Sequence, residues 1–292
     1  MTRDELVAAA GASIRRGSKS FHMASRLFDR PTRERAWLLY CWCRHCDDAC
    51  DGQALGRPDP ARAQGSVEDA AALTRRALAG ETTGILPFDA LATLLRECEI
   101  PHRLVLDHLR GFALDAAGWR PREETDLLAY CYHVAGAVGC MMAVVMGVDP
   151  EDEETLATAS DLGIAFQLSN IARDVREDHE NGRCYLPERW MEQHGVDPRD
   201  PFRPDRRARL VTLVGRITDL AGRFEASAQA GIPKLPFRAR WAVLAAARIY
   251  GAIGRRVAAL GDTAWDGRVI VPRRAKLAFL IPTLIASART AR

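Results

Sequence analysis

The chain has 292 residues, of which 48% are hydrophobic and 27% charged, values typical of a soluble globular protein with ample material for a core. Its formal net charge of +3 is too small to indicate a nucleic-acid partner, and its first residues lack the continuous apolar stretch of a signal peptide. The eight cysteines are therefore expected to be reduced thiols of a cytoplasmic protein and not a disulfide framework.

Apolar residues recur at three- and four-residue spacing along most of the chain and predict helices. The clearest segments are residues 34–50, 88–100, 102–116 and 239–260. Runs rich in Gly, Pro and Asp after Asp51 and near residues 80–87, 117–125 and 196–205 predict loops. No alternating strand pattern recurs, and neither GxGxxG nor GxxxxGK[ST] occurs, so dinucleotide-binding and P-loop folds lose support. We predict one all-α domain over residues 1–292.

The first of these helices carries an acidic stripe next to apolar sequence. At about 100° per residue, Asp51 lies about 40° from Asp47, and Tyr40 and Arg44 lie on the same face. Asp48 lies further round, at the edge of that face, so its role stays open between site and scaffold. Two carboxylates, a guanidinium and a phenol thus share one narrow stripe.

The same segment, CWCRHCDDACD, holds four cysteines, which raises the alternative of a thiolate metal sensor. Zinc sites of that kind usually show C-x2-4-C pairs on turns. Here the spacing is C-x-C-x2-C-x3-C on a predicted helix, which scatters the thiols around the axis. We predict that these cysteines pack as small hydrophobic residues.

A second polar stripe lies in FQLSNIARDVREDHENGRCYLP, residues 166–187. Gln167, Asn170, Asp174 and Asp178 fall within about 80° of one another on a helix. This stripe also adjoins apolar sequence, so it is expected to begin inside the protein.

Hard anionic oxygen ligands select Mg²⁺ or Mn²⁺, and Mg²⁺ is commonly held by a few carboxylates together with substrate phosphate oxygens. Two D-x-x-x-D faces opposed across a cavity could hold metal ions that chelate a diphosphate and help it leave. The same carboxylates facing one another without cations would repel strongly, which argues against a purely structural role.

The segment Leu127–Val148 is long and apolar enough to need a check as a membrane span. Acidic sequence flanks it on both sides, REETD before and DPEDEE after, and neither flank offers the usual basic anchor. We predict a helix buried inside a helical protein.

Four motifs resemble those of the squalene/phytoene synthase family and follow one another along the chain in the family's order. GSKSF at 17–21 resembles its N-terminal substrate-binding signature, and YCYHVAGAVG at 130–139 its central glycine-containing helix. YCWCRHCDDACD and QLSNIARDVREDHENGRCYLP resemble its paired aspartate-rich motifs. The resemblance runs from about residue 11 to about residue 280, and bacterial phytoene synthases look most similar.

The resemblance implies the all-α isoprenoid-synthase fold, a single helical bundle around a central cavity. It also implies phytoene synthase activity, the head-to-head condensation of two geranylgeranyl diphosphates. One diphosphate ionises to an allylic cation, which the double bond of the second molecule attacks to form prephytoene diphosphate. That cyclopropyl intermediate ionises, rearranges and loses a proton to give phytoene, with two diphosphates released. The implied cofactor is Mg²⁺ or Mn²⁺.

The resemblance also implies the site residues. The implied metal ligands are Asp47, Asp51, Asn170, Asp174 and Asp178. The implied contacts to diphosphate or to the reacting groups are Ser18, Lys19, Ser20, Tyr40, Arg44, Gln167, Asn170, Arg173 and Tyr250, with Arg268 as a further phosphate contact.

Several of these residues have structural alternatives. By periodicity Arg173 falls off the second stripe and reads as a surface arginine, while Tyr250 could be core. Ser18 and Ser20 could be an N-cap pair, and His133 stays open between site and scaffold.

Two interpretations are open for the predicted central helix Leu127–Val148. Gly136, Ala137 and Gly139 could leave room for a prenyl tail, with Met141, Met142 and Val145 as its wall. Alternatively, they are small residues at an ordinary helix contact.

Rival functions stay open. A sibling enzyme could make squalene, dehydrosqualene or hydroxysqualene from farnesyl diphosphate, and a non-catalytic assembly factor could share the fold. Because the expected product is a large hydrocarbon, we expect peripheral contact with the inner face of a membrane, with LAFLIPTLIA at 277–286 as a candidate contact, and downstream carotenoid enzymes as possible partners.

Overall fold

The computed structural model describes residues 1–51, 53–54, 57–58 and 67–289; the side chains of Ser20, Cys50 and Asp51 and of the residues at 53–54 and 57–58 lie outside the description. The helices are α1 (Arg3–Gly17), α2 (Lys19–Ser25), α3 (Arg30–Asp51), α4 (Val67–Leu78), α5 (Leu86–Glu97), α6 (His102–Ala116), α7 (Glu124–Cys131), α8 (Ala137–Val145), α9 (Glu153–Glu180), α10 (Glu188–His194), α11 (Arg207–Ala228), α12 (Phe237–Leu260) and α13 (Arg273–Arg289). A two-residue hairpin, β1 (Gln53–Ala54) with β2 (Arg57–Pro58), follows α3. The all-α prediction is confirmed.

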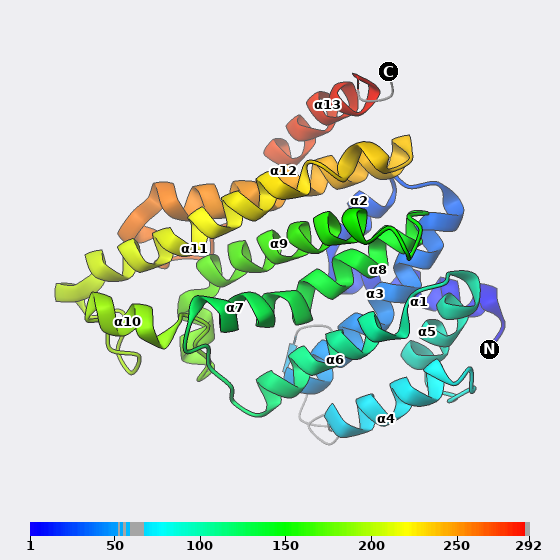
Figure 1. Ribbon diagram of the computed structural model, residues 1–292, viewed down its shortest axis with the longest axis horizontal. Coiled ribbons are helices and arrows are strands. Elements are labelled where there is room, and N and C mark those ends of the chain that lie inside the picture. Colours follow the sequence, from blue (N-terminus) through cyan, green and yellow to red (C-terminus); the bar gives the residue numbers. More distant parts are fainter. Residues whose placement is uncertain (52, 55–56, 59–66, 290–292) are drawn as a thin grey trace.

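Helix α9 runs through the middle of the molecule (Figure 1). Helices α11 and α12 pack on one side of it, and α8 packs on the other. Helix α3 packs against α1, α5 and α6, and α13 packs on α12 at the outer edge of the molecule. The four helices expected from periodicity correspond to α3, α5, α6 and α12.

Capping residues fix where several helices begin. Thr2 and Glu5 form a capping box at the start of α1, with the Thr2 hydroxyl accepting from the backbone N–H of Glu5. Asp152 caps α9, accepting from the backbone N–H of Thr155 at 3.1 Å and from its hydroxyl at 2.6 Å. The long central helix therefore starts at a defined residue, which sets the direction of its polar stripe.

The predicted central helix is continuous from α7 to α8, but one π-helical turn at Tyr132–Gly136 interrupts the α-helical pattern. A Cβ added at Gly139 would overlap the carbonyl oxygen of Ala159 on α9, and one added at Gly136 would lie 2.7 Å from the Ser160 hydroxyl. Gly163 on α9 is equally close to the backbone of the π-turn. The glycines therefore let two helix backbones approach each other. The helix-contact interpretation holds for both glycines, while Gly139 and Met142 also line a cavity, so their place beside a prenyl tail stays a prediction.

By length and composition, the segment Glu124–Val145 is the one helix in the described part of the chain that could cross a membrane, and half of it is buried in the protein. Its buried residues, such as Leu127, Cys131 and Met141, belong to the two main hydrophobic clusters. This agrees with the prediction of a buried helix.

Two of the cysteines in the first acidic motif belong to the core. Cys41 and Cys46 are buried in the cluster formed by α1, α3, α5 and α6. Burial raises the pKa of the Cys41 thiol to about 11 and raises that of Cys46 as well, so both are neutral at physiological pH. For these two residues the packing prediction is confirmed.

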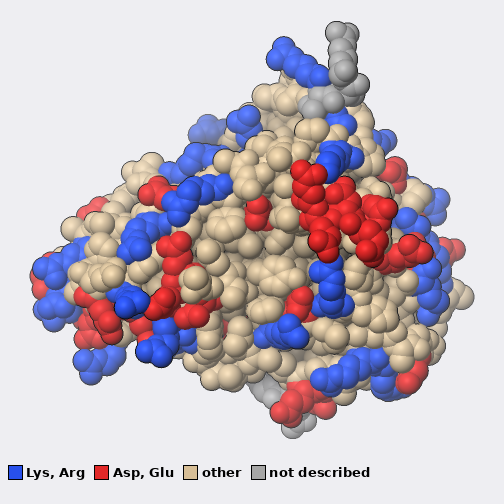
Figure 2. Space-filling model, viewed as in Figure 1, with Lys and Arg blue, Asp and Glu red and all other residues tan. Residues whose placement is uncertain are grey.

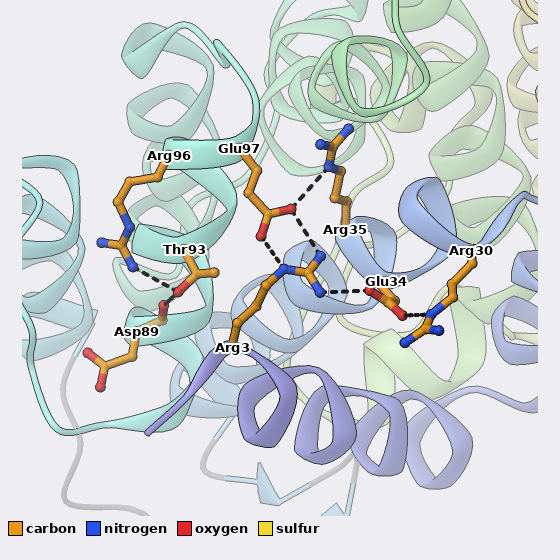
Figure 3. A network of polar contacts seen from close by, with 8 residues as sticks. All are labelled: Arg3, Arg30, Glu34, Arg35, Asp89, Thr93, Arg96 and Glu97. Atoms are coloured by element: carbon orange, nitrogen blue, oxygen red, sulfur yellow. Dashed lines mark hydrogen bonds and ion pairs between the residues drawn. The ribbon is translucent and has the colours of Figure 1, made fainter.

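A network of ion pairs joins the starts of α1 and α3 to the end of α5 (Figure 3). Arg3 donates to Glu97 at 2.6 Å and to Glu34 at 2.7 Å, and Arg35 donates to Glu97 at 3.1 Å. Although burial opposes the shift, hydrogen bonds from Arg30 and Arg3 lower the pKa of Glu34, and hydrogen bonds from Arg3 and Arg35 lower the pKa of Glu97. The network holds in place the end of α3 that lies farthest from its aspartates.

Candidate active site

A cavity of about 570 Å³ lies between α3, α6, the α7–α8 segment, α9 and α12, with α1 and α2 at its edge. Most of its wall is apolar, including Phe28, Leu39, Val138, Met142 and Phe166. The polar residues that line it include Tyr40, Arg44, Asp47, Asp115, Tyr130, Gln167, Asn170 and Tyr250, together with the smaller or neutral groups of Ser18, Ser25, His108, Thr155 and Thr158. Its lining positions on α9 run from Thr155 to Asn170, a rise of roughly 22 Å. The cavity is thus long, apolar for most of its length and polar where the two predicted stripes meet it.

On the α3 wall, one arginine is held by two aspartates with different environments. Arg44 donates to Asp47 at 2.8 Å and to Asp48 at 2.7 Å. The Asp48 side chain is only 4% exposed, whereas that of Asp47 is 45% exposed and lines the cavity. Asp48 therefore belongs to the scaffold that orients Arg44, and Asp47 faces the cavity.

Tyr40 stands beside the turn between α1 and α2. A Cβ at Gly17 would overlap the Tyr40 hydroxyl, so the absence of a side chain at Gly17 makes room for this phenol. Burial raises the pKa of Tyr40 to about 12, although nearby Arg44 lowers it. Tyr40 therefore stays a neutral hydrogen-bonding group.

Ser18 caps α2, its hydroxyl accepting from the backbone N–H of Phe21 at 3.3 Å, and it also lines the cavity. Lys19 is exposed and is not part of the cavity wall. The predicted side-chain contacts of Ser20 and Asp51 fall outside the described residues.

On the α9 wall, Gln167 and Asn170 line the cavity as their stripe predicts. Asp174, one turn further on, is hydrogen-bonded by Arg173, with its Nε 2.7 Å from Oδ1 of Asp174. The Arg173 side chain is only 14% exposed and lies near Tyr250, so the reading as a surface arginine is wrong. The angle of Arg173 on the helix did not predict this contact, because the long arginine side chain can bend along the helix to Asp174.

Arg268 reaches the same stripe from the loop before α13. Its guanidinium lies 3.8 Å from Asp174 and 3.1 Å from Glu177. The loop is anchored on α9, because Arg176 donates to the carbonyl of Trp265 at 2.7 Å and the Trp265 indole donates to the carbonyl of Ala172 at 3.0 Å. The structure thus brings Arg268 to the second acidic motif, while its predicted contact with phosphate stays a prediction.

Asp178 is half-buried at the end of this stripe, next to Arg183 and Tyr185. Burial and the neighbouring charge of Asp174 raise its pKa to about 7, although Arg183 lowers it. The second motif therefore concentrates negative charge where the protein alone compensates it incompletely.

Aromatic rings cover the wall between the two stripes. Tyr250 stacks on Phe166 with ring centroids 4.2 Å apart, and Phe21 lies 5.9 Å from Tyr250 and 6.3 Å from Tyr40. Burial raises the pKa of Tyr250 to about 12, and the nearby guanidinium of Arg173 opposes this shift. Tyr250 is cavity wall, so the core reading is set aside.

The sequence reading missed a hydrogen-bonded group at the same end of the cavity. Asp115 on α6 accepts from the Tyr130 hydroxyl at 2.9 Å and from the Tyr185 hydroxyl at 2.8 Å. Tyr130 stacks on Tyr185 with centroids 4.8 Å apart. A signal existed, because Asp115 follows His108 and Phe112 at helical spacing and so extends an apolar face with a carboxylate.

His108, about two turns before Asp115 on α6, also lines the cavity. Its Nδ1 is 3.0 Å from the carbonyl oxygen of His133, which can only accept, so Nδ1 carries the proton. Its Nε2 is buried without a hydrogen-bond partner among the described residues. The His133 carbonyl comes from the π-turn, so His133 has a scaffold role through its backbone.

No three His, Cys, Asp or Glu side chains within the described residues gather closely enough to hold a metal ion by themselves. Of the predicted ligands, Asp47 on α3 and Asn170 on α9 line the cavity, whereas Asp174 lies one turn beyond that lining and Asp178 lines a separate small pocket further along α9. Such a divided donor set fits ions that complete their coordination with phosphate oxygens.

Comparison with known proteins decides the family. The family model of squalene/phytoene synthases matches residues 14–276. The chain belongs to this family. The phytoene synthase of Pseudescherichia vulneris is 41% identical over 298 residues, covering 100% of this chain and 96% of the relative. The 15-cis-phytoene synthase of Pantoea ananas is 40% identical over 285 residues, covering 96% of this chain and 92% of the relative.

The fold predicted from the family resemblance is confirmed by solved structures. A dehydrosqualene synthase crystallised with a ligand superposes with a TM-score of 0.87 at 25% identity and covers 99% of this chain and 98% of that one. Squalene/phytoene synthases transfer prenyl groups, and the cavity described above is the space that the family resemblance predicted.

Proposed function

We propose that this protein joins two molecules of geranylgeranyl diphosphate head to head, through prephytoene diphosphate, and releases phytoene and two diphosphates. The observation that carries the proposal is the identity of about 40% with bacterial phytoene synthases along nearly the whole chain. Because helices from α1 to α12 contribute to one cavity, we propose that residues 1–292 act as a single domain.

The guanidinium groups near the two stripes suit the diphosphates. Arg44, Arg173 and Arg268 each lie against an aspartate that faces or borders the cavity. Guanidinium binds phosphate in a bidentate manner, so these arginines would turn from their aspartates to the incoming diphosphates. At the turn between α1 and α2, Ser18, Lys19 and Ser20 would contact the diphosphate from the other side of the cavity.

Asp47, Asp51, Asn170, Asp174 and Asp178 would hold divalent cations, for which Mg²⁺ or Mn²⁺ suits the oxygen donors. The raised pKa of Asp178 fits such a role, since that carboxylate lacks full compensation from the protein. A bound divalent cation would neutralise charge on the diphosphate and so ease its departure.

The apolar wall and the aromatic rings would protect the carbocations. Water is excluded along the cavity by residues such as Leu39, Val138 and Phe166. The faces of Tyr250, Phe166 and Phe21 present negative π-electron density to an allylic cation that forms beside the departing diphosphate. Asp115 would hold the phenols of Tyr130 and Tyr185 in fixed directions at the same end.

The test is incubation with Mg²⁺ and geranylgeranyl diphosphate, followed by product analysis. The unmodified protein is expected to form the C40 hydrocarbon, and Asp47→Ala and Asp174→Ala are each expected to reduce its formation by ~100-fold or more, since loss of charge stabilisation of this kind costs that order of rate. Asp200→Ala, an exposed loop aspartate, is the matched control and should keep full activity. Undiminished C40 product from both site variants would overturn the two-stripe mechanism.

The alternative activity uses farnesyl diphosphate, and the structural similarity to a dehydrosqualene synthase favours keeping it as the second candidate. Each diphosphate is supplied alone and the two are then supplied together. A C30 product formed in preference to C40 under competition would replace the first proposal with the second.

A further inference from the structure

Helix α13 presents its apolar side to solvent. Leu277, Ile281 and Ile285 recur every four residues and are 55%, 68% and 48% exposed. Thr283 and Ser287, the uncharged polar residues of the helix, are buried. An ordinary surface helix has the reverse arrangement. We call the face formed by Leu277, Ile281 and Ile285 the α13 stripe.

The two hydroxyl groups on the buried side of α13 have hydrogen-bond partners. The Thr283 hydroxyl donates to the carbonyl of Phe279 at 2.7 Å, and the Ser287 hydroxyl donates to the carbonyl of Thr283 at 2.7 Å. From α12, Trp241 donates to the carbonyl of Leu280 at 3.0 Å and Arg240 to that of Ser287 at 2.9 Å. These bonds fix the rotation of α13, so the outward direction of the stripe is built into the fold.

Basic residues surround the stripe. Arg273, Arg274 and Lys276 lie at the start of α13 and Arg289 at its end, and no Asp or Glu follows Asp266 in the sequence. Residues 203–292 contain 18 Lys or Arg against five Asp or Glu, a formal charge of +13, while residues 1–202 carry −10. Figure 2 shows blue and tan side chains on the tip that carries α13, with a red patch on the body of the molecule below it.

We propose that the α13 stripe docks this protein on the surface of a lipid bilayer that contains anionic headgroups. A helix that exposes Leu and Ile side chains and carries Lys and Arg near both ends can lie in the plane of such an interface. The basic residues meet the negative surface potential while the apolar side chains enter the headgroup boundary. The helix lies on the membrane and does not span it, because only the 12 residues 277–288 separate Lys276 from Arg289, too few to cross the hydrocarbon core.

A second copy of this chain fits the stripe less well. Two α13 helices packed face to face in either direction would bring their arginine clusters together, and the helix has no acidic residue to offset them. Anionic lipid compensates the same arginines. Charge thus selects the lipid surface over self-association.

Docking at α13 would also serve the proposed reaction, and this step alone rests on the proposed function. Helix α12 carries cavity wall on one side, at Ala242, Val243 and Ala246, and holds α13 through Arg240 and Trp241. A membrane on the far side of α13 would be near a cavity that releases a hydrocarbon insoluble in water.

The test is co-sedimentation of the full chain with phosphatidylcholine vesicles, with and without phosphatidylglycerol. Combined replacement of Leu277, Ile281 and Ile285 by Ser should lower partitioning into the anionic vesicles by ~10-fold or more, because binding scales with buried apolar area. The matched control replaces Ile85, Leu106 and Leu260, which are similarly exposed elsewhere, and should bind as the unmodified protein does.

The charge contribution has its own variants. Arg273→Gln with Arg274→Gln should weaken binding to anionic vesicles by ~10-fold or more, since each basic residue near the surface contributes about 1 kcal/mol. Arg75→Gln with Arg103→Gln, two exposed arginines of other helices, should leave binding unchanged.

Unchanged vesicle binding by the stripe variant overturns the proposal. So does a wild-type dimer that ignores vesicles and becomes a monomer in the stripe variant, which would assign the stripe to a second copy. Equal binding to neutral and anionic vesicles would overturn the choice of anionic headgroups. Ile281→Asn alone, with circular dichroism, guards against misfolding and should show a partial loss. Formation of the C40 product in detergent is measured in parallel. If the protein lacks this activity, the vesicle-binding result still tests the docking proposal by itself.

Discussion

Asp115 fixes two phenols at once at the polar end of the cavity, through bonds of 2.9 and 2.8 Å to Tyr130 and Tyr185. Removing the carboxylate in Asp115→Ala leaves both buried hydroxyls without this acceptor. We expect the free energy of unfolding to fall by about 2–4 kcal/mol, because each buried unsatisfied group costs ~1–3 kcal/mol. Urea denaturation measures the change.

Two further variants isolate that effect. Tyr185→Phe in the Asp115→Ala background should cost less than Tyr185→Phe alone, since the two residues share one bond. Asp107→Ala is the control, because Asp107 accepts from a single phenol, that of Tyr132 at 2.8 Å. Strict additivity of the Asp115 and Tyr185 costs would contradict the assigned network.

His108 makes stability depend on pH. Burial lowers its pKa to about 4, whereas an unfolded histidine titrates near 6.5. Between these values the unfolded chain binds the extra proton, so the contribution of His108 to stability is complete above about pH 6.5 and is lost as the pH falls towards 4. The loss is at most about 3 kcal/mol, at 1.36 kcal/mol per pKa unit.

His108→Leu should flatten this part of the pH profile, measured as the difference in unfolding free energy between about pH 7 and pH 5. His102→Gln, at an exposed position at the start of α6, should leave the profile as it is. An identical pH dependence in His108→Leu would show that the residue is not held neutral by burial.

At the scale of elements, the contact of α9 with the π-turn and α8 depends on glycines on both sides of the contact. A Cβ at Gly139 or at Gly163 would overlap backbone atoms of the opposite helix, and backbone cannot move aside as a side chain can. We expect Gly139→Ala and Gly163→Ala each to lower the free energy of unfolding by about 3 kcal/mol or more, the upper range for overpacked cores.

Gly222→Ala on α11 is the matched control, because a Cβ there meets nothing within 4 Å. It should raise stability by about 0.5–1 kcal/mol through helix propensity. Thermal denaturation distinguishes the two classes. Equal effects at Gly139 and Gly222 would contradict a close backbone contact.

Helix periodicity identified which residues share a face but not what the face meets. It placed Tyr40, Arg44 and Asp47 together, and the structure confirms that all three line the cavity. It could not predict the neighbour of Gly139, because a close backbone contact depends on where α9 passes. For the same reason Arg173 was misread from its angle alone, since contact with Asp174 depends on side-chain reach.

At the scale of the molecule, the depth of the cavity should set the preferred substrate length. Val243 lies seven residues, roughly 10 Å along α12, from Tyr250 and lines the deeper apolar part. Val243→Phe should lower kcat/KM for the C20 diphosphate more than that for the C15 diphosphate, with a ratio change of ~10-fold or more, typical of filling an apolar pocket.

Product analysis with the two diphosphates in competition measures that ratio. Val211→Phe, on α11 outside the cavity wall, is the control and should leave the ratio unchanged. An equal loss with both substrates would mean that Val243 does not limit the tail.

The overall assembly of the site was predictable only through resemblance. Composition and periodicity indicate an all-α chain with two acidic stripes, but residues 47 and 174 are far apart in sequence. Nothing local says that their helices face one cavity. Asp115, Tyr130 and Tyr185 were missed for that reason, since they come from three separate segments and meet only in the folded chain.

The π-turn at Tyr132–Gly136 has a consequence for the spacing of the motif around it. A π-turn corresponds to one residue inserted into an α-helix, and its wider turn absorbs the rotation of about 100° that the extra residue would otherwise impose on the rest of the helix. Tyr130 before the turn lines the cavity, and Gly139 after it lies against α9. The turn therefore lets the segment carry one extra residue without changing the faces of α7 and α8. The same turn presents the His133 carbonyl to His108.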